Sequence, residues 1–209
     1  MIEGGAALQL PGDSRWSRRQ SMGTMLAALI FFGFVAGRIR FEGLDGDTLC
    51  NAAYWKILFS PRLAGATNAS TPKPLQAAFV GVCAQLRPWL GNAPIRLVLV
   101  AFGALTVWLL TKASFSFGGG IAASLSLLLC LYELVPFVKG GDSNVFALPF
   151  LLGGIAIGEE SADRPKGYGW SCALIALASL GRVEFIAPLG TMAAANVRRH
   201  GWRTLIWPA

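Results

Sequence analysis

Apolar, uncharged stretches recur along the chain and are separated by short groups of charged residues. A membrane-spanning helix needs about 20 mostly apolar residues, with about 17 as the usual minimum. Six stretches reach or approach this length: residues 20–37, 97–111, 113–132, 143–158, 167–181 and 185–197. This pattern predicts an all-α, polytopic transmembrane helical protein with about six spans.

The region between the first two predicted spans, residues 38–93, is punctuated by prolines, and the sequence leaves open whether residues 75–90 within it cross the membrane. Proline starts or ends helices, so this loop should contain only short ones. Residues 47–59 place apolar side chains at helical spacing, and residues 74–86 form an uncharged run too short for a span. We therefore expect a large external loop that contains interfacial helices lying along the bilayer surface.

The distribution of Lys and Arg predicts that the N-terminus is cytoplasmic. The short external loops would then hold only Lys139 and Arg182, as the positive-inside rule requires. The cytoplasmic segments would hold Arg15, Arg18, Arg19, Lys112, Arg164, Lys166, Arg198, Arg199 and Arg203. The long loop is also basic, but long translocated segments count less in this rule. The chain accordingly divides into a cytoplasmic arm (1–20), a transmembrane module (21–197) and a C-terminal segment (198–209), which is a cytoplasmic tail or the start of a further part.

Composition supports a membrane protein and argues against nucleic-acid binding. Only 14% of the residues are charged and the mean hydropathy is +0.54, whereas a soluble domain carries about 25% charged residues. The net charge of +7 is spread along the chain, while nucleic-acid-binding domains gather basic residues on one face. Anionic lipid headgroups are the simpler partner for this charge.

The cysteines suggest neither a metal site nor a disulfide framework. They are widely separated, at Cys50, Cys83, Cys130 and Cys172, with no metal-ligand spacing. Three of them lie in apolar stretches, where a cysteine usually behaves as a small buried hydrophobe.

Several ionisable residues would lie on the external side, and these are the candidates for chemistry. The acids placed there are Asp45, Asp47, Asp142 and Glu184, while Glu133 lies inside an apolar stretch. Ionisable groups at membrane depth are costly, so they tend to line cavities or to pair with a partner. Carboxylates at a membrane surface could act as a general base or could hold a hard divalent cation.

Three cations on the same side, Lys73, Lys139 and Arg182, would suit a phosphate-bearing substrate. Acids and cations together fit a lipid-linked phosphate donor. A second interpretation applies to the pairs Gly46-Asp47 and Gly141-Asp142, because an aspartate after glycine is more often a turn residue or a helix N-cap.

The order of these features resembles the N-terminal half of the GT-C superfamily of integral-membrane glycosyltransferases, which includes protein O-mannosyltransferases and aminoarabinose transferases. The resemblance covers roughly residues 20–197. In that superfamily a first span precedes an external loop that opens with acids, followed by a surface helix and a Lys-Pro-Pro or His-Pro-Pro type element. An external loop with an acid and a charged element of the Arg-Pro-Glu or Thr-Lys-Gly type come later. The matching motifs here are Leu44-Asp45-Gly46-Asp47-Thr48, Thr71-Pro72-Lys73-Pro74-Leu75, Lys139-Gly140-Gly141-Asp142-Ser143-Asn144 and Leu180-Gly181-Arg182-Val183-Glu184.

The resemblance implies transfer of a sugar from a polyprenyl-phosphate donor to an acceptor on the extracytoplasmic face, usually with inversion. Asp47 or Asp45 would be the general base and Asp142 a second acid near the site. Lys73 and Arg182 would face the donor phosphate. Members of the superfamily differ in their metal dependence, so Mg²⁺ or Mn²⁺ is compatible with this interpretation but not required by it. The expected location is a bacterial cytoplasmic or inner membrane.

Members of the superfamily are usually longer, so we expect this chain to be a fragment or a remnant of such an enzyme. The alternative interpretation is a non-catalytic accessory or structural subunit of a larger membrane complex. A small-solute transporter is a weaker third interpretation, because the sequence shows no paired halves.

Overall fold

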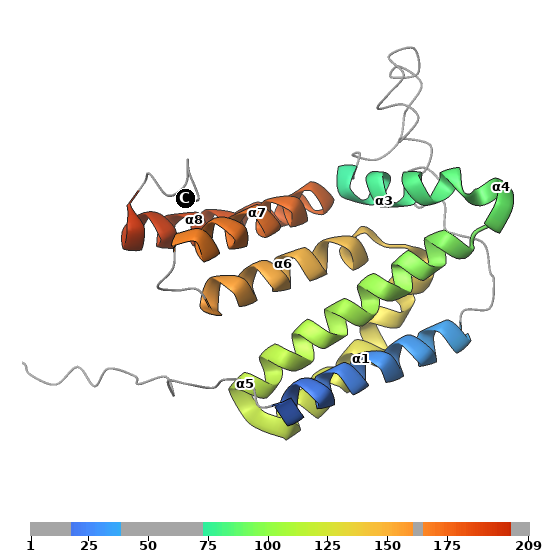
Figure 1. The fold of residues 1–209 in the computed structure, drawn as a ribbon, viewed down its shortest axis with the longest axis horizontal. Coiled ribbons are helices and arrows are strands. Elements are labelled where there is room, and N and C mark those ends of the chain that lie inside the picture. The colour runs from blue at the N-terminus through green and yellow to red at the C-terminus, as the bar shows by residue number, and fades with distance from the viewer. Residues whose placement is uncertain (1–17, 39–72, 161–164, 202–209) are drawn as a thin grey trace, which may run out of the picture.

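The computed structural model describes residues 18–38, 73–160 and 165–201. Within these ranges the regular structure is entirely helical, which confirms the all-α prediction (Figure 1). In chain order the elements are α1 (Arg18–Arg38), α3 (Pro74–Gln85), α4 (Arg87–Leu90), α5 (Ala93–Gly140), α6 (Ser143–Glu160), α7 (Pro165–Gly181), the 3-10 helix η2 (Val183–Phe185) and α8 (Ile186–His200). The predicted helix over residues 47–59 lies outside the described residues.

The long helix α5 is a hairpin with two arms, Ala93–Phe115 and Gly119–Lys139, and Figure 1 shows it folding back on itself. Gly119 has φ +63, in the left-handed region that glycine adopts without steric cost. The arms pack closely, since a Cβ on Gly103 would lie 2.8 Å from Val138 Cγ2. The sequence pattern places this boundary at Lys112. That position is wrong because Lys112 lies within the first arm, where its charge is paired with Glu160 at 2.7 Å.

The turn at Gly119 yields the first testable prediction. Gly119→Ala should cost about 1 kcal/mol, because an L side chain at positive φ clashes with the backbone. Gly120→Ala is the matched control, since a Cβ there meets nothing within 4 Å and its φ is not positive. Thermal unfolding in detergent should show a midpoint about 2–4 °C lower for the first variant only. Equal midpoints would mean that the reversal does not depend on this glycine.

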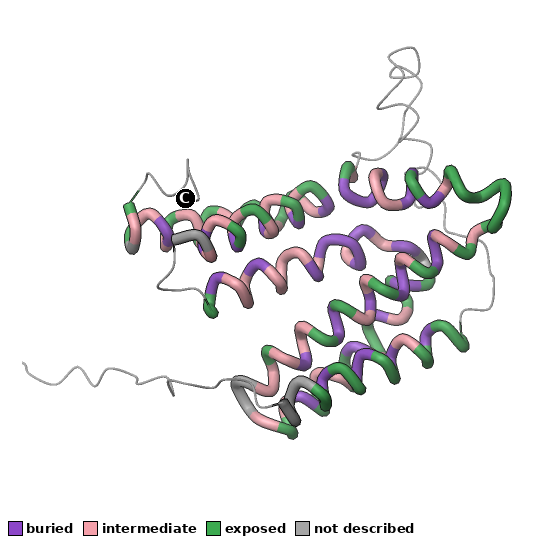
Figure 2. Tube along the Cα trace, in the orientation of Figure 1, coloured by how far each residue is buried: buried purple, intermediate pink, exposed green. Residues whose placement is uncertain are grey.

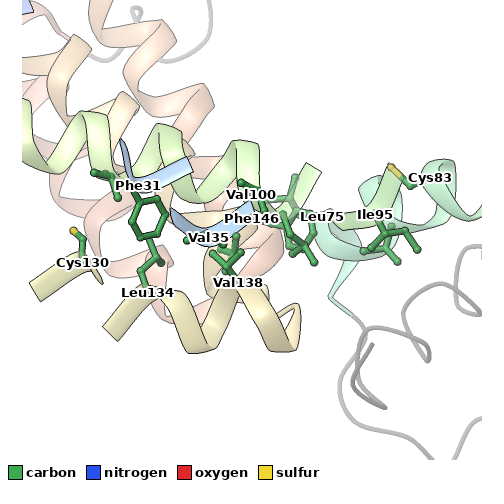
Figure 3. Close-up of a cluster of buried hydrophobic side chains, with 14 residues drawn as sticks. Phe31, Val35, Leu75, Cys83, Ile95, Val100, Cys130, Leu134, Val138 and Phe146 are labelled. Atoms are coloured by element: carbon green, nitrogen blue, oxygen red, sulfur yellow. The ribbon is translucent and has the colours of Figure 1, made fainter. Parts of the chain in front are cut away.

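The core joins α1, α3, both arms of α5, and α6 (Figure 3). Phe31 and Val35 of α1 are fully buried, as are Val107 of α5 and Phe146 of α6. Phe79 of α3 stacks on Phe146 with ring centroids 5.9 Å apart and meets Phe102 edge-on at 4.8 Å. Helix α3 is therefore fixed to the bundle by aromatic packing.

Helices α6 and α7 approach most closely at glycines. A Cβ on Gly154 would lie 2.6 Å from Ile175 Cγ1 and 2.9 Å from the carbonyl oxygen of Ser171. At the other end of the pair, a Cβ on Gly181 would lie 2.9 Å from Ala147 Cβ. These contacts show that α6 and α7 are antiparallel and that their backbones approach closely at the glycines.

Two helices in the described ranges are long and apolar enough to cross a membrane, judged by length and composition: the two arms of α5, at 23 and 21 residues. The segments Met22–Arg38 and Gly167–Gly181 are apolar but shorter. Each of the six predicted stretches does contain a helix. Length and composition of the described helices nevertheless do not support about six spans.

Candidate functional site

Asp142 lies in the turn between α5 and α6, where the backbone holds its carboxylate in place. Gly141 ends α5 in the left-handed conformation with φ 75, and the N–H groups of Gly141 and Asp142 both donate to the carbonyl of Phe137. Asp142 Oδ1 then accepts from the N–H of Asn144 at 2.7 Å. Asp142 is therefore an N-cap of α6, as one of the two interpretations of Gly141-Asp142 predicted.

Arg182 reaches the same place from the turn after α7. Its Nη2 lies 3.3 Å from Asp142 Oδ1 and its Nη1 lies 3.5 Å from Glu184 Oε1. The close contact of Gly181 with Ala147 of α6 explains why the two turns meet, because a larger residue would hold α7 away from α6. Three predicted site residues, Asp142, Arg182 and Glu184, thus form one group, which we call the charged cluster.

The charged cluster is open to its surroundings on one side. The side chains of Arg182 and Asp142 are 29% and 31% exposed, and that of Glu184 is 62% exposed. Ion pairs at this exposure are each worth no more than about 1 kcal/mol, so they orient side chains more than they stabilise the fold. The Nε of Arg182 is buried and has no hydrogen-bond partner among the described residues. The guanidinium therefore keeps donors beyond the two that face the carboxylates.

Gln76 of α3 is a contributor that the sequence analysis missed. It is fully buried, and its Nε2 donates to the carbonyl oxygen of Gly141. The sequence feature that could have indicated Gln76 is an amide side chain inside the apolar run Pro74–Gln85. A polar group that becomes buried there requires a hydrogen-bond partner. Lys73, a predicted phosphate contact, is half-buried one turn earlier, at the start of α3. The N-terminal end of α3 consequently lies beside the Gly141–Asp142 turn.

The remaining predicted residues are not brought into the cluster. Lys139 is exposed in the last turn of α5, and Glu133 is exposed on the second arm rather than lining a cavity. No ion pair of either residue is found within the described parts of the chain. Asp45 and Asp47, the predicted general bases, lie outside the described residues.

The residues described around the cluster do not by themselves fit a Mg²⁺ or Mn²⁺ site. Asp142 and Glu184 offer the oxygen ligands that such cations prefer, but the guanidinium of Arg182 stands between them. No group of three or more His, Cys, Asp or Glu residues suited to a metal occurs in the described ranges. We therefore assign no metal to the cluster.

The cysteines in the described ranges are free, and none belongs to the cluster. Cys83 and Cys130 are buried, as predicted, while Cys172 is partly exposed. Burial raises the pKa of the Cys83 thiol, which keeps it protonated and unreactive near neutral pH. Cys50 lies outside the described residues.

A pocket of about 440 Å³ lies at the opposite end of the bundle, between α1 and the two arms of α5. Its lining is mostly apolar and includes Ala27, Phe115, Ala123 and Leu127. It has no ionisable lining residue among those described.

Comparison with protein-family models, curated proteins and solved structures finds no match for this chain.

Proposed function

We propose that this chain is an integral membrane protein. The main support is the exposure of its apolar helices. In an apolar 18-residue window of each arm of α5, only 17% of the residues of the second arm and 39% of those of the first arm are buried within the protein, whereas the core helix of a soluble protein would be mostly buried. Ile121 and Tyr132 of the second arm are 78% and 79% exposed, and α1 also exposes several large apolar side chains. Lipid is the environment in which such a surface is stable.

The alternation of helix directions supports more than two crossings. Thr24 of α1 shares a pocket with Thr111 near the end of the first arm, so these helices run antiparallel. The arms of α5 are antiparallel, as are α6 and α7. At the end of the chain, the ring of His200 in α8 lies 5.6 Å from that of Tyr168 at the start of α7. The bundle therefore has two ends, and we propose that its helices cross the bilayer about six times.

Both ends then carry a distinct chemistry. The cytoplasmic end would contain the start of α1, the Gly119 turn, the Lys112–Glu160 pair and the end of α8. The opposite, extracytoplasmic end contains the charged cluster and the start of α3. This assignment agrees with the positive-inside rule.

We propose that the chain, alone or as part of a longer enzyme, transfers a sugar from a polyprenyl-phosphate donor to an acceptor at this extracytoplasmic end. The observation that carries the proposal is the meeting of Asp142 and Arg182, which come from turns on two different helices. Segments far apart in sequence converge on one polar group at the end of an apolar bundle. Such a convergence is typical of binding and catalytic sites, which lie in loops held by a rigid scaffold.

In the proposed reaction, the carboxylate of Asp47 removes the proton from the acceptor hydroxyl. The resulting oxygen attacks the anomeric carbon, and a new glycosidic C–O bond forms with inversion. The bond between that carbon and the phosphate oxygen breaks, and the electron pair leaves with polyprenyl phosphate. Arg182 would stabilise the charge on the leaving phosphate through its remaining N–H donors. Asp142 would hold the guanidinium in that position.

The acidic residues of the loop can reach this end of the bundle. Asp45 and Asp47 follow Arg38, the last residue of α1, by seven and nine positions, and a chain extends at most ~3.5 Å per residue. Arg38 belongs to the end of α1 that follows the core residues Phe31 and Val35, on the side of the Gly141–Asp142 turn. The proposed base therefore follows, in sequence, the end of α1 that lies on this side of the bundle.

The proposal predicts that Asp47→Asn strongly slows donor turnover. Membranes containing the chain would be incubated with radiolabelled polyprenyl-phosphate sugars, and release of polyprenyl phosphate would be measured by chromatography. Loss of a general base should lower the rate by about 10²–10⁴-fold. The control is Glu159→Gln, an exposed acid at the cytoplasmic end.

Three results would contradict parts of the assignment. Full turnover in Asp47→Asn would remove the proposed base. No turnover by the parent chain, together with stoichiometric partners in detergent purification, would instead favour the non-catalytic complex subunit. Release of the chain from membranes at alkaline pH would exclude the membrane location itself.

A further inference from the structure

The connection between α3 and α5 is an exposed, apolar elbow. Every residue from Gln85 to Gly91 is exposed, and the short helix α4 within this stretch contains no buried residue. Leu86, Trp89 and Leu90 are 41%, 77% and 58% exposed. Figure 2 shows this exposed stretch around α4 at the right-hand end of the molecule. We call residues 85–91 the elbow.

Exposure of these apolar side chains to water is unfavourable, so we expect them to be in contact with another apolar surface. Burying one large apolar side chain is worth about 1.5–3 kcal/mol. Three such side chains of the elbow, Leu86, Trp89 and Leu90, are exposed. The neighbouring helix α3 shows that apolar side chains nearby are buried wherever they face the bundle, since Leu75, Ala77, Val80 and Cys83 are all buried. The elbow contributes nothing to that core.

The position of the elbow along the chain indicates what covers it. The first arm of α5 begins at Ala93, directly after the elbow, and its 23 residues suffice to cross the bilayer. The elbow therefore lies at one end of a proposed span, at the depth of the lipid headgroups. The exposed apolar surface continues from the elbow onto this arm at Leu97, which is 60% exposed.

The residue composition of the elbow is also typical of the headgroup region of a membrane. Tryptophan concentrates at membrane interfaces because its ring is apolar and its N–H is polar. The one charged residue of the elbow, Arg87, is a cation that complements anionic lipid phosphates. A basic, Trp-containing element at the end of a span fits the bilayer rim better than an aqueous surface.

We propose that the elbow docks into the headgroup region of the extracytoplasmic leaflet. Trp89 and Leu90 lie at the boundary between headgroups and acyl chains, and Arg87 contacts lipid phosphates. Because α3 connects the elbow to Gln76 and hence to the carbonyl of Gly141, this docking fixes the depth of the Asp142 turn relative to the membrane surface. The inference rests on the proposed membrane location and is independent of sugar transfer.

The test measures the depth of a spin label at position 89. The full chain carrying Trp89→Cys, with Cys50→Ser and Cys172→Ser to limit labelling elsewhere, would be reconstituted in vesicles of phosphatidylcholine and phosphatidylglycerol. Collision rates of the nitroxide with oxygen and with a water-soluble nickel chelate report its depth. We expect a depth about 5–10 Å inside the headgroup boundary. A label at Leu90→Cys should agree, and one at Glu159→Cys should be accessible to the nickel chelate.

Three results would overturn the elbow assignment while leaving the membrane location intact. These are full access of the chelate to position 89, a depth at the bilayer centre, and exclusion of both reagents by a co-purifying protein. Release of the chain itself from the vesicles at alkaline pH would overturn both proposals.

Discussion

Asp142→Asn is expected to reduce turnover of a polyprenyl-phosphate sugar by about 10²-fold while leaving the fold intact. Asparagine is as good an N-cap as aspartate, so the hydrogen bond from the N–H of Asn144 can be kept. The substitution removes only the charge that faces Arg182 at 3.3 Å. In the proposed reaction the guanidinium then loses the partner that orients it toward the donor phosphate, and electrostatic contributions of this kind are worth about 10²–10³-fold.

The comparison with Asp142→Ala separates chemistry from folding. Alanine removes both the charge and the cap, which adds a stability loss of about 1 kcal/mol. Donor turnover in membranes would be measured beside the unfolding midpoint in detergent for both variants. If Asp142→Asn turned over donor at the parent rate, Asp142 would serve only to cap α6.

Gly154→Ala is expected to destabilise the bundle, because the added methyl group has no room between α6 and α7. The new Cβ would lie 2.6 Å from Ile175 Cγ1 and 2.9 Å from a backbone oxygen of α7, which cannot rotate away. Helix α7 must therefore move, at a cost of about 1–3 kcal/mol. For a chain of this size each kcal/mol lowers the unfolding midpoint by about 2–4 °C.

The adjacent residue supplies the control. A Cβ on Gly153 would meet Leu174 Cδ1 only at 3.9 Å, which is ordinary contact, and alanine favours a helix over glycine by up to about 1 kcal/mol. Gly153→Ala should therefore unfold at the same temperature as the parent chain or slightly above it, as followed by thermal denaturation in detergent. Equal unfolding midpoints for the two variants would show that the backbones of α6 and α7 do not approach closely at Gly154.

Sequence patterns locate the helices of this chain better than they locate its turns. Uncharged runs correspond to helices because both reflect segments without polar interruption. The boundary predicted at Lys112 is wrong because a charged residue need not end a helix, and the pairing of Lys112 with Glu160 lets it remain in one. The true reversal has a positive φ at Gly119. The sequence Gly118-Gly119-Gly120 alone does not distinguish a turn from close packing.

The same contrast applies to the charged cluster. Asp142, Arg182 and Glu184 are predictable because charges are rare in this chain and therefore conspicuous. Gln76 is not, since a single amide in an apolar run gives no indication of the carbonyl it will meet across the fold. The expectation that Glu133 lines a cavity or pairs with a partner follows from its apolar sequence environment, but the side chain of Glu133 is exposed in the structure.

The reversal at Gly119 has a consequence for how the protein is made. The two arms of α5 are neighbours in sequence as well as in space, so their pairing requires closure of only a very short loop. A helical hairpin of this kind can form from contacts within α5 alone. It would then offer a finished surface on which α1 docks from one direction and α6 from the other.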